Sequence, residues 1–377
     1  MKIAIGGIRG LPAHYRGYET AVDEIARRMQ QLGHNVTVYC RAKKGERGES
    51  EYAGIKLVHL RVVPFNNLET IIHSIAVGLH VAFHRKDVDV VHMYNAASAF
   101  GGIFVRLAGK PLIMTLDGVD WERDAWGWIA RLVLKVSYWL SVRVANVVIC
   151  DSKVVKSIFD KRFGANTQVI PYGAKRIKNA TSSYQCFGLE RSKYFIFIGR
   201  LVREKGADIL LDAYAKVGSD MPLVIVGDNE LDPEYVAMLH RKAGANVKFL
   251  GCRYGEEYES LLSNARAYVT ASKLEGTSPS LLAAMGAHVC CLVRGIPENI
   301  ETGGDSVLYF NGGIDDLVNK WRMISEDAGI VNKFASKGFE RVVSDYDWDA
   351  VTKQYLTVYS DTLGDMFSKS QVRERVS

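Results

Sequence analysis

Short runs of apolar residues alternate along the chain with segments in which apolar residues recur every three or four positions. A continuous apolar run predicts a strand covered on both faces, and the three-to-four spacing predicts a helix. In the first half the helical spacing is clearest over Tyr18–Leu32, which Gly33 ends. The runs that predict strands in this half are Lys2–Gly6, Val36–Tyr39, Val88–His92, Leu112–Thr115 and Val144–Cys150.

The alternation starts again after a polar stretch at Lys175–Ser192, which lacks periodicity and is typical of a linker. The strands predicted beyond it are Tyr194–Gly199, Leu223–Gly227, Val247–Leu250, Ala267–Ser272 and Val289–Val293. Strands alternating with helices indicate parallel sheets, so two such series predict two Rossmann-like α/β domains. The expected divisions are a first domain at 1–178, a second at 190–345, a C-terminal helix at 346–367 that packs back on the first domain, and a polar tail at 368–377.

Composition narrows the class of protein without choosing a function. The 377 residues are 48% hydrophobic and 24% charged, which is typical of a globular protein. The net charge of +6 permits an anionic ligand or an anionic membrane surface, and no nucleic acid partner is expected. There is no apolar window of about 18 residues that would span a membrane, and the chain opens on a strand rather than a signal peptide. Six cysteines without a CxxC pair predict reduced, buried thiols and a cytoplasmic location.

A glycine-rich loop follows the first predicted strand. It reads Gly6-Gly7-Ile8-Arg9-Gly10 and continues to Tyr15-Arg16-Gly17-Tyr18-Glu19-Thr20. Glycines at this place let the backbone approach a ligand, and the next helix offers N–H groups to an anion. The loop is not GxGxxG, and no strand-end acid supports NAD, so a dehydrogenase is disfavoured. A plain strand-to-helix turn remains the alternative.

A second cluster, Gly199–Gly206, lies between the predicted strand Phe195–Ile198 and a predicted helix at Ala207–Val217. Open α/β sheets bind ligands beyond the carboxyl ends of their strands. At that place Arg200 and Lys205 can converge on phosphate oxygens. The alternative is a solvated basic loop.

A third cluster follows a later strand and reads Ser272-Lys273-Leu274-Glu275-Gly276-Thr277-Ser278-Pro279. Ser278 followed by Pro279 is typical of an N-cap and the first helical position. The exposed amino end of a helix attracts a diphosphate, and Glu275 can accept hydrogen bonds from sugar hydroxyls. Taken alone, a glutamate such as Glu275 is more often an ordinary surface acid.

The chain resembles the family 4 glycosyltransferases of the GT-B fold over essentially its whole length. GRLVREKG resembles the family's Gly-Arg-x-x-x-x-Lys-Gly motif for the donor phosphates, and SKLEGTSPSLLAAM resembles its E-x7-E region. The opening IGGIRGLPAHYRGYET, with HxV at 34–36, resembles a bacterial branch associated with surface-polysaccharide assembly that includes rhamnosyltransferases. The resemblance implies two Rossmann-like domains whose parallel sheets face a central cleft.

The resemblance also implies roles for individual residues. Arg200 and Lys205 would bind the donor diphosphate, and Glu275 would contact the transferred sugar. The other donor contacts would come from Gly276, Thr277 and Ser278 in the second domain and from Gly7 and Gly17 in the first. Family members retain anomeric configuration and need no metal, so neither a metal site nor a bound cofactor is expected. The positive loop and the helix end would stabilise the departing nucleoside diphosphate.

Two positions depart from the family pattern. The second Glu of E-x7-E falls at Ala283, and in the family this Glu usually holds the nucleotide ribose. The loss of such a charge-assisted contact costs about 1.5–3 kcal/mol of binding. Arg16 stands where a Gly usually precedes Gly17, and it either adds a phosphate contact or crowds the loop.

The acceptor side is expected in the first domain. Asp117 follows the predicted strand Leu112–Thr115, where a carboxylate can orient or deprotonate an acceptor hydroxyl. A turn or N-cap aspartate is the alternative. Tyr94 and Asn95 are predicted to line the same site. The segment that follows contains both aromatic and basic residues, which predicts either a segment at a membrane surface or one packed on the domain core. These residues are Trp121, Trp126, Trp128, Tyr138 and Trp139, with Arg123, Arg131, Lys135 and Arg143.

We therefore expect a retaining glycosyltransferase that moves a hexosyl or deoxyhexosyl group, such as rhamnosyl, from a nucleotide diphosphate sugar. The expected acceptor is a hydroxyl of a glycan or lipid-linked glycan in surface-polysaccharide synthesis, at the cytoplasmic face of the cell membrane. The alternatives are a nucleotide-sugar epimerase or phosphorylase-like enzyme of the same fold, and a catalytically weak sugar-nucleotide-binding protein, which Ala283 keeps open.

Overall fold

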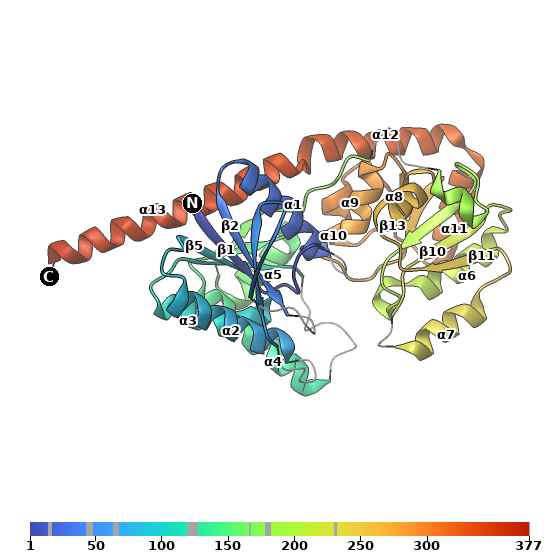
Figure 1. The fold of residues 1–377 in the computed structure, drawn as a ribbon. Coiled ribbons are helices and arrows are strands. Elements are labelled where there is room, and N and C mark those ends of the chain that lie inside the picture. The colour runs from blue at the N-terminus through green and yellow to red at the C-terminus, as the bar shows by residue number, and fades with distance from the viewer. Residues whose placement is uncertain are drawn as a thin grey trace. The chain divides into compact units, whose positions relative to one another are not determined.

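The computed structural model describes residues 1–13, 17–42, 48–62, 68–118, 127–165, 167–177, 182–229 and 232–376. The chain divides into two compact units, each built around its own sheet (Figure 1). Unit 1 comprises Met1–Tyr172 together with Trp348–Ser377, and unit 2 comprises Gly173–Asp347. Two parallel-sheet Rossmann-like units are the fold class that the alternating pattern predicts.

Unit 1 contains an eight-stranded sheet in the order β3-β4-β2-β1-β5-β6-β7-β8. All neighbouring strands are parallel except β3 and β4, which are antiparallel. The chain order reverses between β1 and β5, which makes that pair the topological switch point of this sheet. The strands are β1 (Lys2–Gly6), β2 (Asn35–Arg41), β3 (Gly48–Tyr52), β4 (Ile55–Leu60), β5 (Val90–Tyr94), β6 (Leu112–Leu116), β7 (Val147–Cys150) and β8 (Thr167–Val169).

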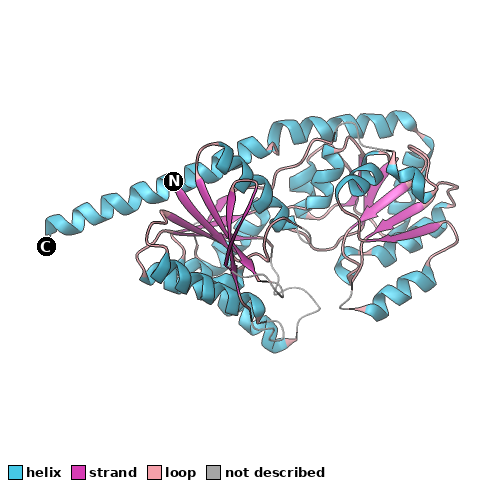
Figure 2. Cartoon of the chain, viewed as in Figure 1, coloured by secondary structure: helices cyan, strands magenta, loops and turns pink. Residues whose placement is uncertain are grey.

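Helices cover the central strands of this sheet (Figure 2). The apolar side chains of these strands are buried. The helices of unit 1 are α1 (Gly17–Gln31), α2 (Glu69–His84), the short 3-10 helix η1 (Ala96–Ser98), α3 (Ala99–Leu107), α4 (Trp128–Val144), α5 (Lys153–Phe163) and α13 (Trp348–Val376). Among the described residues, none of the helices has the length and hydropathy needed to cross a membrane.

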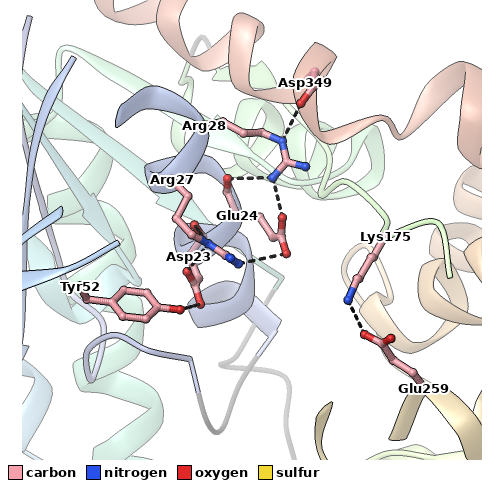
Figure 3. A network of polar contacts seen from close by, with 8 residues as sticks. All are labelled: Asp23, Glu24, Arg27, Arg28, Tyr52, Lys175, Glu259 and Asp349. Atoms are coloured by element: carbon pink, nitrogen blue, oxygen red, sulfur yellow. Dashed lines mark hydrogen bonds and ion pairs between the residues drawn. The ribbon is translucent and has the colours of Figure 1, made fainter. Parts of the chain in front are cut away.

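Helix α13 is the last element of the chain but packs in unit 1. Arg28 of α1 donates from Nε to Asp349 Oδ1 at 2.7 Å and from Nη1 to Glu24 Oε2 at 2.5 Å (Figure 3). Further along α13, Tyr355 and Tyr359 are fully buried. The helix therefore contributes core side chains as well as an ion pair to unit 1.

Unit 2 contains a six-stranded, all-parallel sheet in the order β11-β10-β9-β12-β13-β14. This order reverses between β9 and β12, which is the topological switch point of a doubly wound sheet. The strands are β9 (Phe195–Ile198), β10 (Leu223–Val226), β11 (Val247–Gly251), β12 (Ala267–Thr270), β13 (Cys290–Arg294) and β14 (Leu308–Phe310).

The core of unit 2 is apolar and aromatic, with Phe195, Phe197, Leu223, Ile225 and Trp321 all buried. The Trp321 ring meets Phe195 edge-on, with centroids 5.4 Å apart. Its helices are η3 (Ser183–Phe187), η4 (Arg203–Lys205), α6 (Ala207–Val217), α7 (Pro233–Lys242), α8 (Gly255–Ser263), α9 (Pro279–Gly286), α10 (Pro297–Gly303), α11 (Ile314–Glu326) and α12 (Ala328–Asp345).

The boundaries differ from the expected ones in places that have local causes. The first unit ends at Tyr172 rather than at 178, because the next residues bond within unit 2. Ala174 N donates to Tyr346 O at 2.8 Å, and Ile177 N donates to Gly286 O at 3.0 Å. Helix α13 runs to Val376, beyond the expected end at 367.

Two local expectations are wrong, and one local feature was not predicted. The strand predicted over Val144–Cys150 begins at Val147, since α4 extends through the β-branched Val142 and Val144. The hairpin of β3 and β4 was not predicted at all, because β3 is a polar edge strand with no buried residue. Cys186 and Cys252 are exposed, whereas the other cysteines are buried as expected.

Candidate functional site

In unit 2 the candidate residues gather at the carboxyl ends of β9 and β12, the switch point of the sheet. Two hydrogen bonds to a backbone carbonyl oxygen connect the loops that follow these strands. Lys273 N donates to Glu204 O at 2.8 Å, and the Ser272 hydroxyl donates to the same carbonyl oxygen at 3.4 Å. The loop carrying the basic residues and the loop carrying Glu275 therefore form one connected structure.

Lys205 and Glu275 form an ion pair across these two loops. The distance from Lys205 Nζ to Glu275 Oε1 is 2.5 Å, and their side chains are 22% and 8% exposed. An ammonium has three N–H donors and a carboxylate has several acceptor positions, so this pair leaves both groups able to bind a ligand. The sequence predicted each residue separately, and the structure brings the two side chains into contact.

Gly206 makes the close approach of the two loops possible. Its φ is +67°, and a Cβ at this position would lie 2.6 Å from the carbonyl oxygen of Ala271. Only glycine adopts such a conformation without strain and also leaves room for the neighbouring backbone. The Lys-Gly pair at the end of the basic motif is thus explained by packing as well as by charge.

Helix α9 begins at Pro279, shortly after Glu275 in the sequence. Ser278 is at the N-cap position with an extended backbone, and Pro279 is the first helical residue, as predicted. The Ser278 side chain makes no capping hydrogen bond to the helix. Thr277 and Ser278 are 4% and 2% exposed, while Gly276 is half-buried. The first N–H groups of a helix have no intrahelical acceptor and can bind an anion.

Arg200 is exposed at the start of the basic loop, directly after β9 and Gly199. The loop is held by residues that the sequence analysis did not select. Asn229 donates from Nδ2 to Leu201 O at 3.2 Å, and Leu201 N donates to Asp228 O at 3.3 Å. Asp228 and Asn229 follow β10, the strand next to β9. Their position directly after a predicted strand is the sequence feature that could have identified them.

In unit 1 the glycine-rich loop follows β1, next to β5. Gly7 has a φ of +84°, and a Cβ there would lie 2.1 Å from Tyr94 O and 2.5 Å from Ser98 Oγ. Arg9 N donates to the buried Glu19 carboxylate at 3.0 Å, which joins this loop to α1. Gly17 is the first residue of α1. Arg16, where the sequence departs from the family pattern, lies outside the described residues.

Asp117 follows β6 at the same edge of the sheet. The buried Tyr172 hydroxyl donates to Asp117 Oδ2 at 3.2 Å. Burial raises the pKa of Tyr172 well above its usual value, so this hydroxyl stays protonated and remains a donor. The contact holds the Asp117 carboxylate in one orientation, and the sequence analysis missed Tyr172 because it lies 55 residues away in the chain.

Tyr94 and Asn95 lie at the end of β5, but their side chains make contacts within unit 1. The Tyr94 ring is 2% exposed and lies 4.3 Å from the His92 ring, centroid to centroid. Asn95 has a φ of 72°, and its side chain accepts from Ala97 N to cap η1. Asn95 N donates to Thr115 O at 3.1 Å, two residues before Asp117. Their contribution to acceptor binding stays a prediction.

His92 is fully buried behind this strand end. Its Nδ1 lies 2.6 Å from the Tyr359 hydroxyl of α13, and its Nε2 lies 2.8 Å from the Thr115 hydroxyl. Burial lowers the pKa of His92 to about 3, so the imidazole is neutral at pH 7. The three side chains connect α13 to β5 and β6 beside Asp117.

His92 is expected to make unit 1 less stable in acid. In the unfolded chain its pKa is near 6.5, so between that value and about 3 unfolding takes up a proton. The free energy of unfolding should therefore fall by about 1.4 kcal/mol per pH unit from this group as the pH drops below 6.5. Urea unfolding at pH 7 and pH 5 tests this. His92→Gln should reduce the pH dependence, and an unchanged dependence would assign the loss to other groups.

Within the described part of the chain, no group of His, Cys, Asp or Glu is arranged to hold a metal ion.

Each half of the chain matches the model of a known protein family. The model of Glycosyltransferase Family 4 matches residues 15–175, and the model of Glycosyl transferases group 1 matches residues 187–341.

Individual relatives are distant. An uncharacterized glycosyltransferase of Methanocaldococcus jannaschii is 23% identical over 81% of this chain and 83% of its own length. A D-rhamnosyltransferase of Pseudomonas aeruginosa is 34% identical over 30% of each chain. The structure of the Anabaena protein HepE, solved in complex with UDP and glucose, superposes with a TM-score of 0.78 at 20% identity and covers 96% of this chain and 100% of that one.

Proposed function

The chain belongs to the family 4 glycosyltransferases, and on this premise we propose that unit 2 binds a nucleotide diphosphate sugar and unit 1 binds the acceptor. The reaction is retaining transfer of a hexosyl group. The bond between the sugar and the diphosphate breaks, and a bond from the same sugar carbon to an acceptor hydroxyl oxygen forms. No resident cofactor takes part in this proposal.

The Lys205–Glu275 pair at the switch point is the observation that carries the proposal. As the sugar leaves, negative charge grows on the diphosphate, and fixed positive groups stabilise it. Lys205, Arg200 and the amino end of α9 are the positive groups of this loop cluster to which we assign the diphosphate. Glu275, oriented by Lys205, accepts hydrogen bonds from the sugar hydroxyls. Asp117, oriented by Tyr172, would orient or deprotonate the acceptor hydroxyl.

The sugar and the acceptor are the finer part of the proposal. The partial match to a D-rhamnosyltransferase supports a deoxyhexosyl donor such as a rhamnosyl nucleotide, and the HepE complex supports a uridine nucleotide as the first donor to try. We propose a glycan or lipid-linked glycan as the acceptor, in polysaccharide synthesis at the cytoplasmic face of the membrane. The roles proposed for Lys205, Arg200 and Glu275 are the same for each of these donors.

Calorimetric titration with UDP, GDP, TDP and ADP, and then with their sugars, tests the donor assignment. We expect selective binding of one nucleotide, which Arg200→Ala abolishes. Arg203→Ala is a matched control in the same loop, because Arg203 packs over the Tyr235 ring at 4.9 Å and lies 3.7 Å from Asp232. Wild-type protein that binds none of the nucleotides would overturn the proposal.

Ala283 supplies a second prediction. It lies on α9, half-buried, where family members usually hold the ribose through a carboxylate. Ala283→Glu should tighten nucleotide binding by about tenfold or more, since a charge-assisted hydrogen bond contributes about 1.5–3 kcal/mol. Unchanged affinity would mean that the site is adapted to alanine. Tight binding without turnover on any acceptor, in both forms, would favour a sugar-nucleotide-binding protein.

A further inference from the structure

Helix α4 has the reverse of the usual polarity of a surface helix. Its buried positions are Ser137, Tyr138 and Ser141, whose hydroxyls bond to backbone carbonyls. Its exposed positions carry large apolar side chains: Trp128 (77% exposed), Ile129 (60%), Leu132 (55%), Val136 (44%) and Trp139 (51%). A helix that only covers a sheet would place its apolar residues inward.

The exposed side chains form one continuous face. Positions 128, 132, 136, 139 and 143 follow helical spacing, so they lie along one side of α4. Lys135 and Arg143 are exposed on the same side, and the Arg143 guanidinium lies 5.8 Å from the centre of the Trp139 ring. No aspartate or glutamate occurs between Trp128 and Val144. We call this side of the helix the outer face of α4.

We infer that the outer face of α4 docks on an anionic lipid bilayer, with the helix lying in the plane of the surface. Trp rings favour the interface between headgroups and acyl chains, and basic side chains bind lipid phosphates. The helix has 17 residues and three basic side chains, which suits the interface rather than the bilayer interior.

The charge of the outer face selects a lipid surface over a second copy of the chain. If two copies met through this face, Lys135 and Arg143 of each would face basic residues of the other, and α4 has no carboxylate to pair with them. Like charges brought together in an interface oppose association. An anionic bilayer offers both an apolar layer for the Trp side chains and negative charge for the basic ones.

The docked helix is directly connected to the candidate acceptor site. The Tyr138 hydroxyl of α4 donates to Gly118 O at 3.3 Å, and Gly118 immediately follows Asp117. Docking would therefore fix the backbone beside Asp117 relative to the membrane, where a lipid-linked acceptor lies. This last step rests on the proposed function, whereas docking itself does not.

Sedimentation with phosphatidylcholine vesicles, with and without about one third phosphatidylglycerol, tests docking without donor or acceptor. We expect binding to the anionic vesicles that the double variant Trp128→Ser with Trp139→Ser weakens about tenfold or more. Lys135→Glu should weaken binding to anionic vesicles, and high salt should do the same. Leu32→Ser and Lys161→Glu change exposed residues elsewhere in unit 1 and should leave binding unchanged.

Several results would overturn docking: no binding by the wild type, equal binding by the double variant, or a dimer in solution that the double variant abolishes. The last result would assign the outer face to a second copy of the chain. Nucleotide titration of the same variants separates the two proposals. Vesicle binding without nucleotide binding would support docking and remove the proposed donor site. Nucleotide binding without vesicle binding would support the donor site and remove docking.

Discussion

Replacing Lys205 by methionine is expected to lower kcat/KM for sugar transfer by about a thousandfold, or roughly 4 kcal/mol of transition-state stabilisation. Two effects combine in this loss. The departing diphosphate loses a nearby positive charge, and Glu275, whose side chain is only 8% exposed, loses the ammonium that orients it at 2.5 Å. Because a buried carboxylate without its partner is costly, the variant should also be less stable.

Steady-state kinetics with the donor found by titration would measure this loss. Arg203→Met is the matched control, since Arg203 belongs to the same loop but contacts Tyr235 and Asp232 instead. Glu275→Gln and the double variant complete a mutant cycle, in which strongly non-additive losses indicate that the pair acts as a unit. A loss of less than tenfold in Lys205→Met would show that the ion pair is structural only.

Gly7→Ala is expected to lower the free energy of unfolding by about 3–5 kcal/mol. The backbone at Gly7 has a φ of +84°, and the added Cβ would lie 2.1 Å from the carbonyl oxygen of Tyr94. That carbonyl belongs to the end of β5, so the strand or the loop must move to admit the methyl group. Chemical denaturation followed by the far-ultraviolet circular dichroism signal measures the change.

Gly33→Ala separates backbone strain from the steric contact. Gly33 has nearly the same φ, +83°, but nothing lies within 4 Å of the Cβ position. It should therefore cost only the conformational term, about 1–2 kcal/mol. Equal losses in the two variants would show that the backbone of Tyr94 has room to move, and that the close approach of β1 and β5 is not required.

Sequence patterns predicted the buried strands well, because a strand such as Leu223–Val226 is apolar on both faces and is covered by helices. They failed at β3, where Gly48–Tyr52 is polar and exposed at the edge of the sheet. They also misplaced the start of β7, since the β-branched residues at the end of α4 are compatible with both a helix and a strand.

At the candidate site, residue type was predictable and contact was not. Arg200, Lys205 and Glu275 follow strands in recognisable motifs, but the 2.5 Å contact between Lys205 and Glu275 depends on how two loops pack through Gly206 and Ala271. Tyr172 and Tyr359 contact Asp117 and His92 across 55 and 267 residues. Because neither tyrosine belongs to a local motif, only the fold reveals its partner.

The division of the chain has a consequence for its synthesis. Unit 1 needs α13, whose Tyr355 and Tyr359 are fully buried and whose Tyr359 hydroxyl lies 2.6 Å from His92, yet unit 2 is translated in between. On the ribosome, unit 2 can complete its core first, while the earlier half of the chain waits for its last helix. A nascent chain that stops at Asp347 would lack the Tyr359 hydroxyl that contacts His92 and the buried rings of Tyr355 and Tyr359.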